Sequence, residues 1–533
     1  MYSDLPKNQR DILTSEQNTI INSTEPNIIV SASPGCGKTY TLVEKIKKDY
    51  PGKTEKFGFI ACSFTREASK QLENKLSNDV NLSLSFVGTI DAFVLTVIIS
   101  PFKNRCLRHF LNSPILEREL IITMPSFSSK SNEITKIGKS HLEVDSYYQK
   151  WISDFKIGKY EISYCAYLLA LNMINNMPEV KSFISSRYTC IYVDEAQDLN
   201  EFQHDLIKVL KDTCKLKTFL IGDKNQSIYE FRGAKPTLFS SLVNSDYVNY
   251  PISISVRCHK SIMDFSNLFL DDSAKAITKS ENKVYIYDNF TTSVLDGIIS
   301  TNDNILWISD TNELAQIFFN YSLSKNFEFK YTKPLELNDT NFVGTYYNLL
   351  EELLRFYYNY QNPITALSYS IDDIEIILLD YITEKSFKVI KKKVIDVSIS
   401  PKDYIYSILT AIGIHISEAT LNEIEQQLKN SVCSEHYTRT NDKKRIMTIH
   451  SSKGLEAHTV IVFIDYDDYF YNKFPNDREA KMRAYYVAFS RAEKELHIFF
   501  RNSKVDKYGN NRPVNQQFIR TRIKQTFDKL IVQ

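Results

Sequence analysis

Residues 27–46 read NIIVSASPGCGKTYTLVEKI, and this stretch decides the fold. The apolar run 28–30 is typical of a buried β-strand, and the apolar residues within 42–46 recur at helical spacing. Between them lies ASPGCGKT (32–39), which follows the phosphate-loop pattern except that alanine stands where the pattern has its first glycine. A strand, a glycine-rich loop and a helix in this order predict an α/β fold that binds a nucleotide.

The residue types of this loop suit a triphosphate. Gly35 and Gly37 allow backbone N–H groups to turn inward around phosphate oxygens, and the helix N-terminus adds its dipole. We expect Lys38 to reach the β- and γ-phosphates and the Thr39 hydroxyl to hold Mg²⁺. The alternative, a glycine-rich turn that only starts a helix, is disfavoured by the strand and helix around it. The expected nucleotide contacts of the loop are Ser33, Gly35, Cys36, Gly37, Lys38, Thr39 and Tyr40.

Two further strand-like segments end in polar residues suited to hydrolysis. Residues 190–193 run into Asp194, expected to hold Mg²⁺ through water, and Glu195, expected to orient and deprotonate the attacking water. Acidic residues after a strand are most often a solvated turn, but a phosphate loop in the same chain favours the catalytic interpretation. Residues 218–222 lead to Gln226, which can detect the γ-phosphate.

Aromatic residues follow this glutamine. Tyr229 and Phe231 alternate around Glu230, and their rings can stack on unstacked bases. Taken alone, such a pair is more often part of a core.

Motifs along most of the chain resemble, in the same order, those of the UvrD/Rep/PcrA group of superfamily 1 helicases. SFTREA (63–68) and GTIDAF (88–93) resemble the two DNA-contacting motifs of the first half. MTIHSSKGLE (447–456) and RAYYVAFSRA (483–492) are similar to the fifth and sixth motifs. The resemblance implies two RecA-like P-loop domains with parallel sheets flanked by helices, each domain carrying a mostly helical insertion.

The resemblance also implies roles for single residues. Gln17 resembles the glutamine that reads adenine, and Arg257 and Arg491 resemble arginines that reach the phosphates from the second domain, Arg491 as an arginine finger. Gly454 and Glu456 would lie beside the nucleotide. The expected catalytic residues are therefore Lys38, Glu195, Gln226, Arg257 and Arg491. The expected DNA contacts are Phe64, Thr65, Arg66, Thr89, Tyr229, Phe231, Arg232, Thr448 and His450.

With these arginines on the other domain, hydrolysis is expected to require closure of the cleft between the domains. Closure and reopening would move the DNA contacts of one domain relative to those of the other. Helicases of this group step along single-stranded DNA in the 3′ to 5′ direction.

Several phrases also resemble the helicase-like subunits of Gabija antiviral systems, among them SRYTCIYVDEAQD (186–198), KLKTFLIGDKNQSIYEFRGAKP (215–236) and VRCHKSIMDFSNLF (256–269). That family implies a partner, an OLD-family nuclease subunit (GajA) with an ABC-type ATPase domain, in a larger hetero-oligomer. Two other functions stay open: an NTPase switch that senses DNA ends or nucleotide depletion without unwinding, and a housekeeping repair helicase.

The sequence departs from the helicase pattern at three positions. Val256 stands where the family usually has an aromatic residue that stacks on adenine, so other nucleoside or deoxynucleoside triphosphates can compete with ATP. Arg66 replaces an asparagine and adds a potential phosphate contact. Ser490 replaces a threonine, which is a mild change.

The motifs and the helical patterns predict six segments. The first RecA-like domain, 1A, is expected in 1–93 and 183–250, interrupted by a helical insertion, 1B, in 94–182. The second, 2A, is expected in 251–340 and 443–533, interrupted by a reduced helical insertion, 2B, in 341–442.

Composition sets outer limits on function. No run of about 18 apolar residues is present, and the first residues lack an apolar leader, so we expect a cytoplasmic protein with no membrane span. The eight cysteines are scattered without a CxxC pair, which disfavours zinc and a disulfide framework. A net charge of +1 gives no support for nucleic acid by itself.

Overall fold

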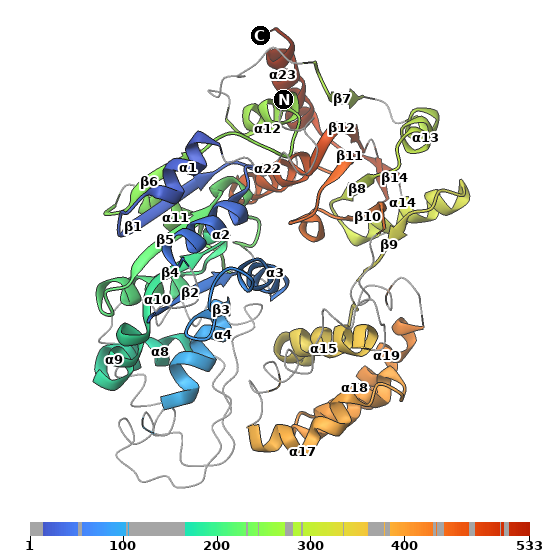
Figure 1. Ribbon diagram of the computed structural model, residues 1–533. Helices are drawn as coiled ribbons and strands as arrows, with labels where there is room; N and C mark the ends of the chain where they lie inside the picture. Colours follow the sequence, from blue (N-terminus) through green and yellow to red (C-terminus); the bar gives the residue numbers. More distant parts are fainter. Residues whose placement is uncertain are drawn as a thin grey trace.

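The computed structural model describes residues 14–51, 56–64, 66–102, 105, 166–230, 233–243, 245–271, 281–288, 291–333, 335–360, 378, 384–429, 433, 442–467, 475–501, 503–505 and 511–532. Its strands form two six-stranded sheets, one in each half of the chain (Figure 1). Every pairing within these two sheets is parallel. The predicted fold class, two RecA-like domains each built on a parallel sheet, is confirmed.

The first sheet has the strand order β3-β2-β4-β5-β1-β6. Its strands are β1 Asn27–Ala32, β2 Gly58–Ser63, β3 Phe86–Thr89, β4 Tyr188–Val193, β5 Lys217–Gly222 and β6 Val248–Ile252. Because successive side chains of a strand point to opposite faces, Ile29 enters one core while Ile28 and Val30 enter the other. Apolar residues on both faces therefore produce a sheet that is covered on both sides.

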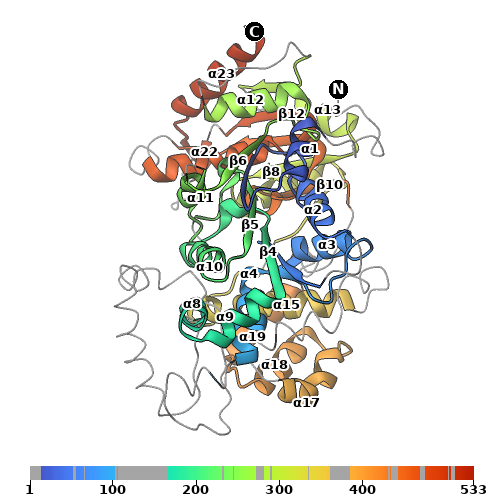
Figure 2. The ribbon, with the colours of Figure 1, turned by 60° about the vertical axis from the view of Figure 1, so that its left-hand side comes forward.

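Helices cover the two faces of this sheet. Figure 2 shows α2 and α3 on one side of β4 and β5 and helices α8, α9 and α10 on the other. The helices of this half are α1 Ser15–Asn22, α2 Lys38–Asp49, α3 Arg66–Leu76, α4 Ile90–Phe93, α8 Ala166–Asn176, α9 Pro178–Arg187, α10 Glu201–Asp212 and α11 Pro236–Leu242. A π-helix, Val94–Ile99, and short 3₁₀ turns, Ser100–Phe102, Ala196–Asp198 and Lys224–Gln226, complete it.

The second sheet has the order β7-β12-β11-β8-β10-β9. Its strands are β7 Val284–Tyr287, β8 Ile305–Ser309, β9 Lys330–Tyr331, β10 Lys444–Thr448, β11 Ala457–Ile464 and β12 Ala492–Phe500. One face packs against α12 Lys260–Leu270, α22 Pro475–Phe489 and α23 Gln517–Val532, and the other against α13 Thr292–Thr301 and α14 Asn312–Ser324. A short hairpin, β13 Ser503–Val505 and β14 Asn511–Pro513, lies outside this sheet.

The segment between β9 and β10 is helical in its described part and has its own core. Its helices are α15 Thr340–Tyr360, α17 Glu384–Ile395, α18 Pro401–Ala411 and α19 Glu418–Leu428. Leu350, Leu353 and Leu354 of α15 are fully buried against Ile405 and Ile408 of α18. The apolar stripe of α15 thus packs within its own helical unit.

The structure adds detail at the expected domain borders. Strand β6 continues to Ile252, so the first sheet extends two residues past 250. Residues 94–102 and 166–182, at the two ends of the expected insertion 1B, contribute Val94, Ile98 and Met173 to the core of the first sheet. Residues 106–165 lie outside the described residues. Among the helices that the structure describes, none is both long enough and apolar enough to cross a membrane.

Candidate nucleotide and DNA site

The phosphate loop connects β1 to α2 at the carboxyl edge of the first sheet. Gly35 and Gly37 have φ of 67° and 78°, in the left-handed region that favours glycine. Lys38 begins α2 and is 9% exposed. Burial raises the pKa of the Cys36 thiol to about 12, so that this thiol is neutral at physiological pH. The loop is therefore a turn that depends on its two glycines and buries the side chains of Cys36 and Lys38.

The chain crosses from the first sheet to the second domain directly over this loop. The N–H of Ser33 donates to the carbonyl of Ile252 at 2.9 Å, and the N–H of Val256 donates to the carbonyl of Gly35 at 2.9 Å. A Cβ on Gly35 would lie 2.5 Å from the Cβ of Arg257. Only glycine fits at position 35, because both its conformation and its distance from the crossing segment exclude a side chain.

The side chains expected to hold Mg²⁺ lie together. The Thr39 hydroxyl donates to Asp194 Oδ2 at 2.7 Å. A hydroxyl and a carboxylate are hard oxygen donors that suit Mg²⁺, which usually keeps water and phosphate oxygens as its other ligands. No cluster of three or more His, Cys, Asp or Glu able to hold a metal ion occurs in the part of the chain that the structure describes. These donors fit an ion that arrives with a nucleotide.

Glu195 is held in an unusual backbone conformation. Its φ is 54°, which is costly for a residue with a side chain and is typical of functional sites. Gln197 Nε2 donates to Glu195 Oε2 at 2.5 Å. Burial raises the pKa of Asp194, with the adjacent charge of Glu195 as the next cause. Burial also acts to raise the pKa of Glu195, but the charges of Lys38 and Lys453, the hydrogen bond from Gln197 and the charge of Arg491 together lower it, so Glu195 is ionised.

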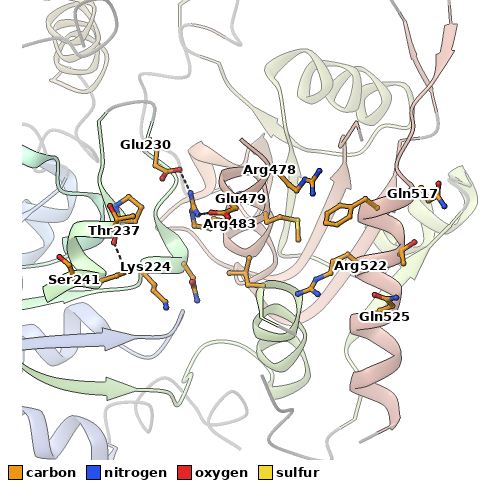
Figure 3. A pocket seen from close by; sticks show the side chains of 17 residues that line it. Lys224, Glu230, Thr237, Ser241, Arg478, Glu479, Arg483, Gln517, Arg522 and Gln525 are labelled. Atoms are coloured by element: carbon orange, nitrogen blue, oxygen red, sulfur yellow. Dashed lines mark hydrogen bonds and ion pairs between the residues drawn. The ribbon is translucent and has the colours of Figure 1, made fainter. Parts of the chain in front are cut away.

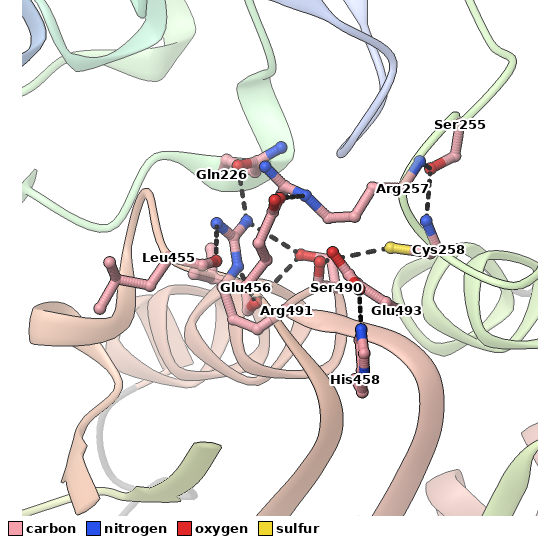
Figure 4. A network of polar contacts seen from close by, with 11 residues as sticks. Gln226, Ser255, Arg257, Cys258, Leu455, Glu456, His458, Ser490, Arg491 and Glu493 are labelled. Carbon is pink, nitrogen blue, oxygen red and sulfur yellow. Dashed lines mark hydrogen bonds and ion pairs between the residues drawn. The ribbon is translucent and has the colours of Figure 1, made fainter. Parts of the chain in front are cut away.

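Arg491 extends from the end of α22 to the first domain (Figure 4). Its Nη2 donates to Gln226 Oε1 at 3.1 Å, and its Nε and Nη1 donate to the carbonyls of Val487 and Leu455 at 3.0 and 3.3 Å. The side chain is among the largest fully buried ones. Burial and the charge of Arg257 lower the pKa of Arg491 to about 10, which leaves it charged at pH 7.

Arg257 is near the same cluster but is paired with Glu456. Arg257 Nε lies 2.5 Å from Glu456 Oε2, with side-chain exposures of 21% and 46%. Gly454, two residues earlier, has φ of 86° and open space around it. The structure thus brings Lys38, Glu195, Gln226, Arg257 and Arg491 close together where the two domains meet. Their catalytic roles stay predictions.

Gln17 contacts the phosphate loop. Its Nε2 donates to the carbonyl of Cys36 at 3.1 Å, and its Oε1 accepts from the N–H of Thr14 at 2.9 Å. The side chain is 3% exposed. These contacts brace the loop, and adenine reading by Gln17 stays a prediction.

Three of the described residues expected to contact DNA, Phe64, Tyr229 and His450, form an aromatic group. Phe64 and Tyr229 stack with ring centroids 5.1 Å apart and an interplanar angle of 17°, and the His450 ring lies 6.4 Å from Tyr229. The Thr448 hydroxyl donates to Ser451 Oγ, and the Thr89 hydroxyl caps α4 by accepting from the N–H of Ala92. Thr65, Phe231 and Arg232 lie outside the described residues, as does the side chain of Arg66 at the start of α3.

Two charged contacts between the domains were not predicted from the sequence. Lys453 forms an ion pair with Asp198 and donates to the carbonyl of Gln226 at 3.1 Å. Arg483 Nη2 pairs with Glu230 at 2.5 Å, and its Nε donates to the carbonyl of Ser227 at 3.2 Å. Both basic residues lie within motifs quoted from the sequence. Their place in these motifs was the only signal in the sequence that could have pointed to these contacts.

A cavity of about 1270 Å³ also lies between the domains (Figure 3). It is lined by residues of the 3₁₀ turn Lys224–Gln226 and of α11, α12, α22 and α23, among them Lys224, Thr237, Phe518 and Arg522. Among the described residues, none of those predicted for nucleotide or DNA binding lines this cavity. The phosphate loop is not part of it either.

Comparison with known families agrees with this architecture. Residues 13–163 and 161–246 match the UvrD/REP helicase N-terminal domain, and residues 385–503 match the UvrD-like helicase C-terminal domain. Fold and matches together define an ATP-using, helicase-like protein, and the chain belongs to the UvrD-like helicase family.

The chain is also similar to individual proteins of this class. The Gabija protein GajB of Bacillus cereus (strain VD045) is 25% identical over 504 residues, which cover 90% of this chain and 94% of that protein. The ATP-dependent DNA helicase PcrA of Staphylococcus epidermidis is 25% identical over 266 residues, and that of Staphylococcus aureus is 23% identical over 258. Each PcrA match covers 42% of this chain but only 34% of PcrA.

Proposed function

We propose that this chain is an ATP-driven motor that moves 3′ to 5′ along single-stranded DNA, as the helicase-like subunit of a Gabija antiviral system. One observation carries the motor part of the proposal. Arg491 of the second domain donates a hydrogen bond to Gln226 of the first, and Glu195 lies near enough to both Arg491 and Lys38 for their charges to lower its pKa. Such a site is complete only when the two domains meet, which links hydrolysis to their movement.

In the proposed reaction, water attacks the γ-phosphorus of ATP while the bond from that phosphorus to the bridging oxygen of ADP breaks. Glu195 orients the water and receives its proton. Lys38, Arg257 and Arg491 stabilise the negative charge on the transferred group; an arginine finger contributes about 10³–10⁵ in turnover in this chemistry. Mg²⁺, held through Thr39 and Asp194, would neutralise charge on the phosphate oxygens.

Arg257 must change partner during this cycle. In the structure it is paired with Glu456, and a γ-phosphate would compete for the same guanidinium. Since partly exposed ion pairs are worth up to about 1 kcal/mol, this exchange requires little energy. Val256 offers no aromatic face to the base, so we expect ATP to be used together with other NTPs or dNTPs.

The catalytic assignment is tested by phosphate release measured with and without single-stranded DNA. Lys38→Ala and Glu195→Gln should each abolish DNA-stimulated hydrolysis and leave the melting temperature within a few degrees. Lys429→Ala, at an exposed lysine of the helical insertion, is the control. Normal turnover in either site variant would remove the assignment.

Direction and mode of action need a second assay. Duplexes with a 3′ or a 5′ single-stranded tail distinguish the proposed 3′ to 5′ motor, which should displace a strand only from the 3′-tailed substrate. Hydrolysis without displacement of any strand would favour the alternative of a sensor switch.

The partner is tested by co-expression. The match over nearly the full length of GajB supports an OLD-family nuclease subunit (GajA) as partner, in a larger hetero-oligomer. Co-purification of this chain with the OLD-family nuclease encoded next to it is the expected result. Absence of such a gene beside its own would favour a housekeeping repair helicase.

A further inference from the structure

The large cavity between the domains (Figure 3) has one wall from each of them. Lys224 and Thr237 of the first domain lie on one side, and Arg522 and Gln525 of α23 lie on the other. The part of α22 that lines it, residues 478–483, is the end of this helix opposite to Arg491. At about 1270 Å³ the cavity exceeds the roughly 300–1,000 Å³ of pockets for small molecules. It therefore has room for a segment of a macromolecule.

The lining of this cavity is more basic than the chain as a whole. The described residues that line it include four basic and two acidic side chains, whereas the whole chain has 65 and 64. Both acidic side chains, Glu230 and Glu479, lie beside Arg483, at 2.5 and 3.9 Å. The other three basic side chains supply the excess of positive charge, which favours an occupant that carries negative groups.

These basic side chains stand on both walls. Lys224 is exposed at the start of the 3₁₀ turn Lys224–Gln226. On the opposite wall, Arg522 donates from Nε and Nη2 to the carbonyls of Phe269 and Leu268 at 2.8 and 3.1 Å, which fixes its guanidinium at the end of α12. A negative group in the cavity would thus meet positive charge from either domain.

An apolar surface, formed by Leu270, Met482 and Phe518, lies among these charges. The Phe518 ring stacks on Tyr466 with centroids 5.9 Å apart, and the Arg478 guanidinium lies 4.9 Å from its centroid. Even so, Phe518 is 39% exposed. A supported aromatic ring that stays exposed beside an arginine is a frequent anchor of contacts between proteins.

This mixed lining suits a peptide better than a nucleic acid. A DNA strand carries a negative charge at every nucleotide, and its phosphates would also meet Glu479, whose side chain is 81% exposed. A peptide can place its carboxylates at the basic side chains and an apolar side chain at Phe518. Its backbone can bond to hydroxyl and amide groups of the lining such as those of Thr237 and Gln517.

We propose that this cavity is the docking site for an acidic peptide segment of a partner protein. A large apolar side chain of the segment packs against Phe518, and its carboxylates lie near Lys224, Arg478 and Arg522. The inference goes beyond the proposed function, because this binding requires neither hydrolysis nor DNA. Since the two walls belong to different domains, the segment contacts both domains at once.

The test is fluorescence anisotropy of a labelled synthetic peptide, rich in glutamate around a central leucine–phenylalanine pair, added to the full chain without nucleotide. We expect saturable binding that weakens as salt is added. Lys224→Glu and Phe518→Ala should each raise Kd by about fivefold or more. The matched controls should keep Kd: Lys235→Glu, at an exposed lysine outside the lining, and Phe57→Ala, at a ring that is 48% exposed.

A third variant covers the case in which Phe518→Ala loses stability with its contact to Tyr466. Thr237 is exposed in the first turn of α11, where a negative charge is favourable, so Thr237→Glu should fold and bind the peptide more weakly. The inference is overturned by absence of saturable binding, by equal affinity for a peptide with lysine in place of glutamate, or by an unchanged Kd in folded Lys224→Glu and Thr237→Glu. It is also overturned if oligo(dT) displaces the peptide and Phe518→Ala weakens oligo(dT) binding, which would assign the cavity to nucleic acid.

Discussion

Arg491 is expected to contribute both to catalysis and to the stability of the domain interface, and replacing it by lysine allows the two contributions to be measured separately. Lysine keeps a positive charge but not the planar fork, so most of the hydrogen bonds of Arg491 to Gln226, Leu455, Val487 and Ser490 would be lost. At about 0.5–1.5 kcal/mol per bond, losing three costs roughly 2–4 kcal/mol of folding free energy. Loss of an arginine finger lowers turnover about 10³–10⁵-fold, which corresponds to about 4–7 kcal/mol in the barrier.

Phosphate release at saturating ATP and DNA, with a melting curve of the same sample, measures the two effects separately. We expect kcat to fall by at least 10³ at a temperature where the variant is still folded. Arg501→Lys is the matched control, because Arg501 is also mostly buried and pairs with Asp465 at 3.1 Å inside the second domain. A kcat of Arg491→Lys within tenfold of the unaltered chain would refute the reasoning, however far the melting temperature moved.

Three further variants address other parts of the molecule. Tyr229→Ala should weaken binding of a labelled oligonucleotide by about 1–3 kcal/mol, measured by fluorescence anisotropy, and Tyr229→Phe should bind normally; equal affinities would exclude the ring stacked on Phe64 as a base platform. Gly35→Ala should raise KM for ATP at least tenfold, since its Cβ would meet Arg257; an unchanged KM contradicts this. Burial lowers the pKa of His204 to about 4, below the unfolded value of about 6.5, so its stabilising effect is full above pH 6.5 and is lost as pH falls toward 4. Denaturant titrations should show about 2 kcal/mol of this loss between pH 7 and 5, and His204→Gln should remove that part; an identical pH dependence in the variant would be contrary evidence.

The fold could be predicted because its strands carry strong local signals. The runs at 28–30, 190–193, 219–221, 305–308 and 460–463 are apolar on both faces, as expected of parallel strands covered by helices, and each lies in a strand of the structure. The order of polar residues after these strands then predicted which side chains would meet at the carboxyl edge of the sheet.

The contacts between the domains could not be predicted in the same way. Lys453 and Asp198 are 255 residues apart, and nothing in their local sequence separates them from solvated charges. The pairing of Arg257 with Glu456 depends on how two domains meet, which is a property of tertiary packing. Likewise, Gln17 donates a hydrogen bond to the Cys36 carbonyl only because α1 packs over the phosphate loop, and this position could not be predicted from the local sequence.

The crossing between the domains has a mechanical consequence. Between Ile252, the last residue of β6, and Arg257 the chain has only four residues, and hydrogen bonds from Ser33 and to Gly35 fasten both ends of this strap to the phosphate loop. Because this connection is so short, a rotation of the second domain relative to the first also displaces the phosphate loop. If flexible residues lengthened this connection, movement of the second domain would no longer displace the phosphate loop. We expect such a chain to hydrolyse ATP without moving along DNA.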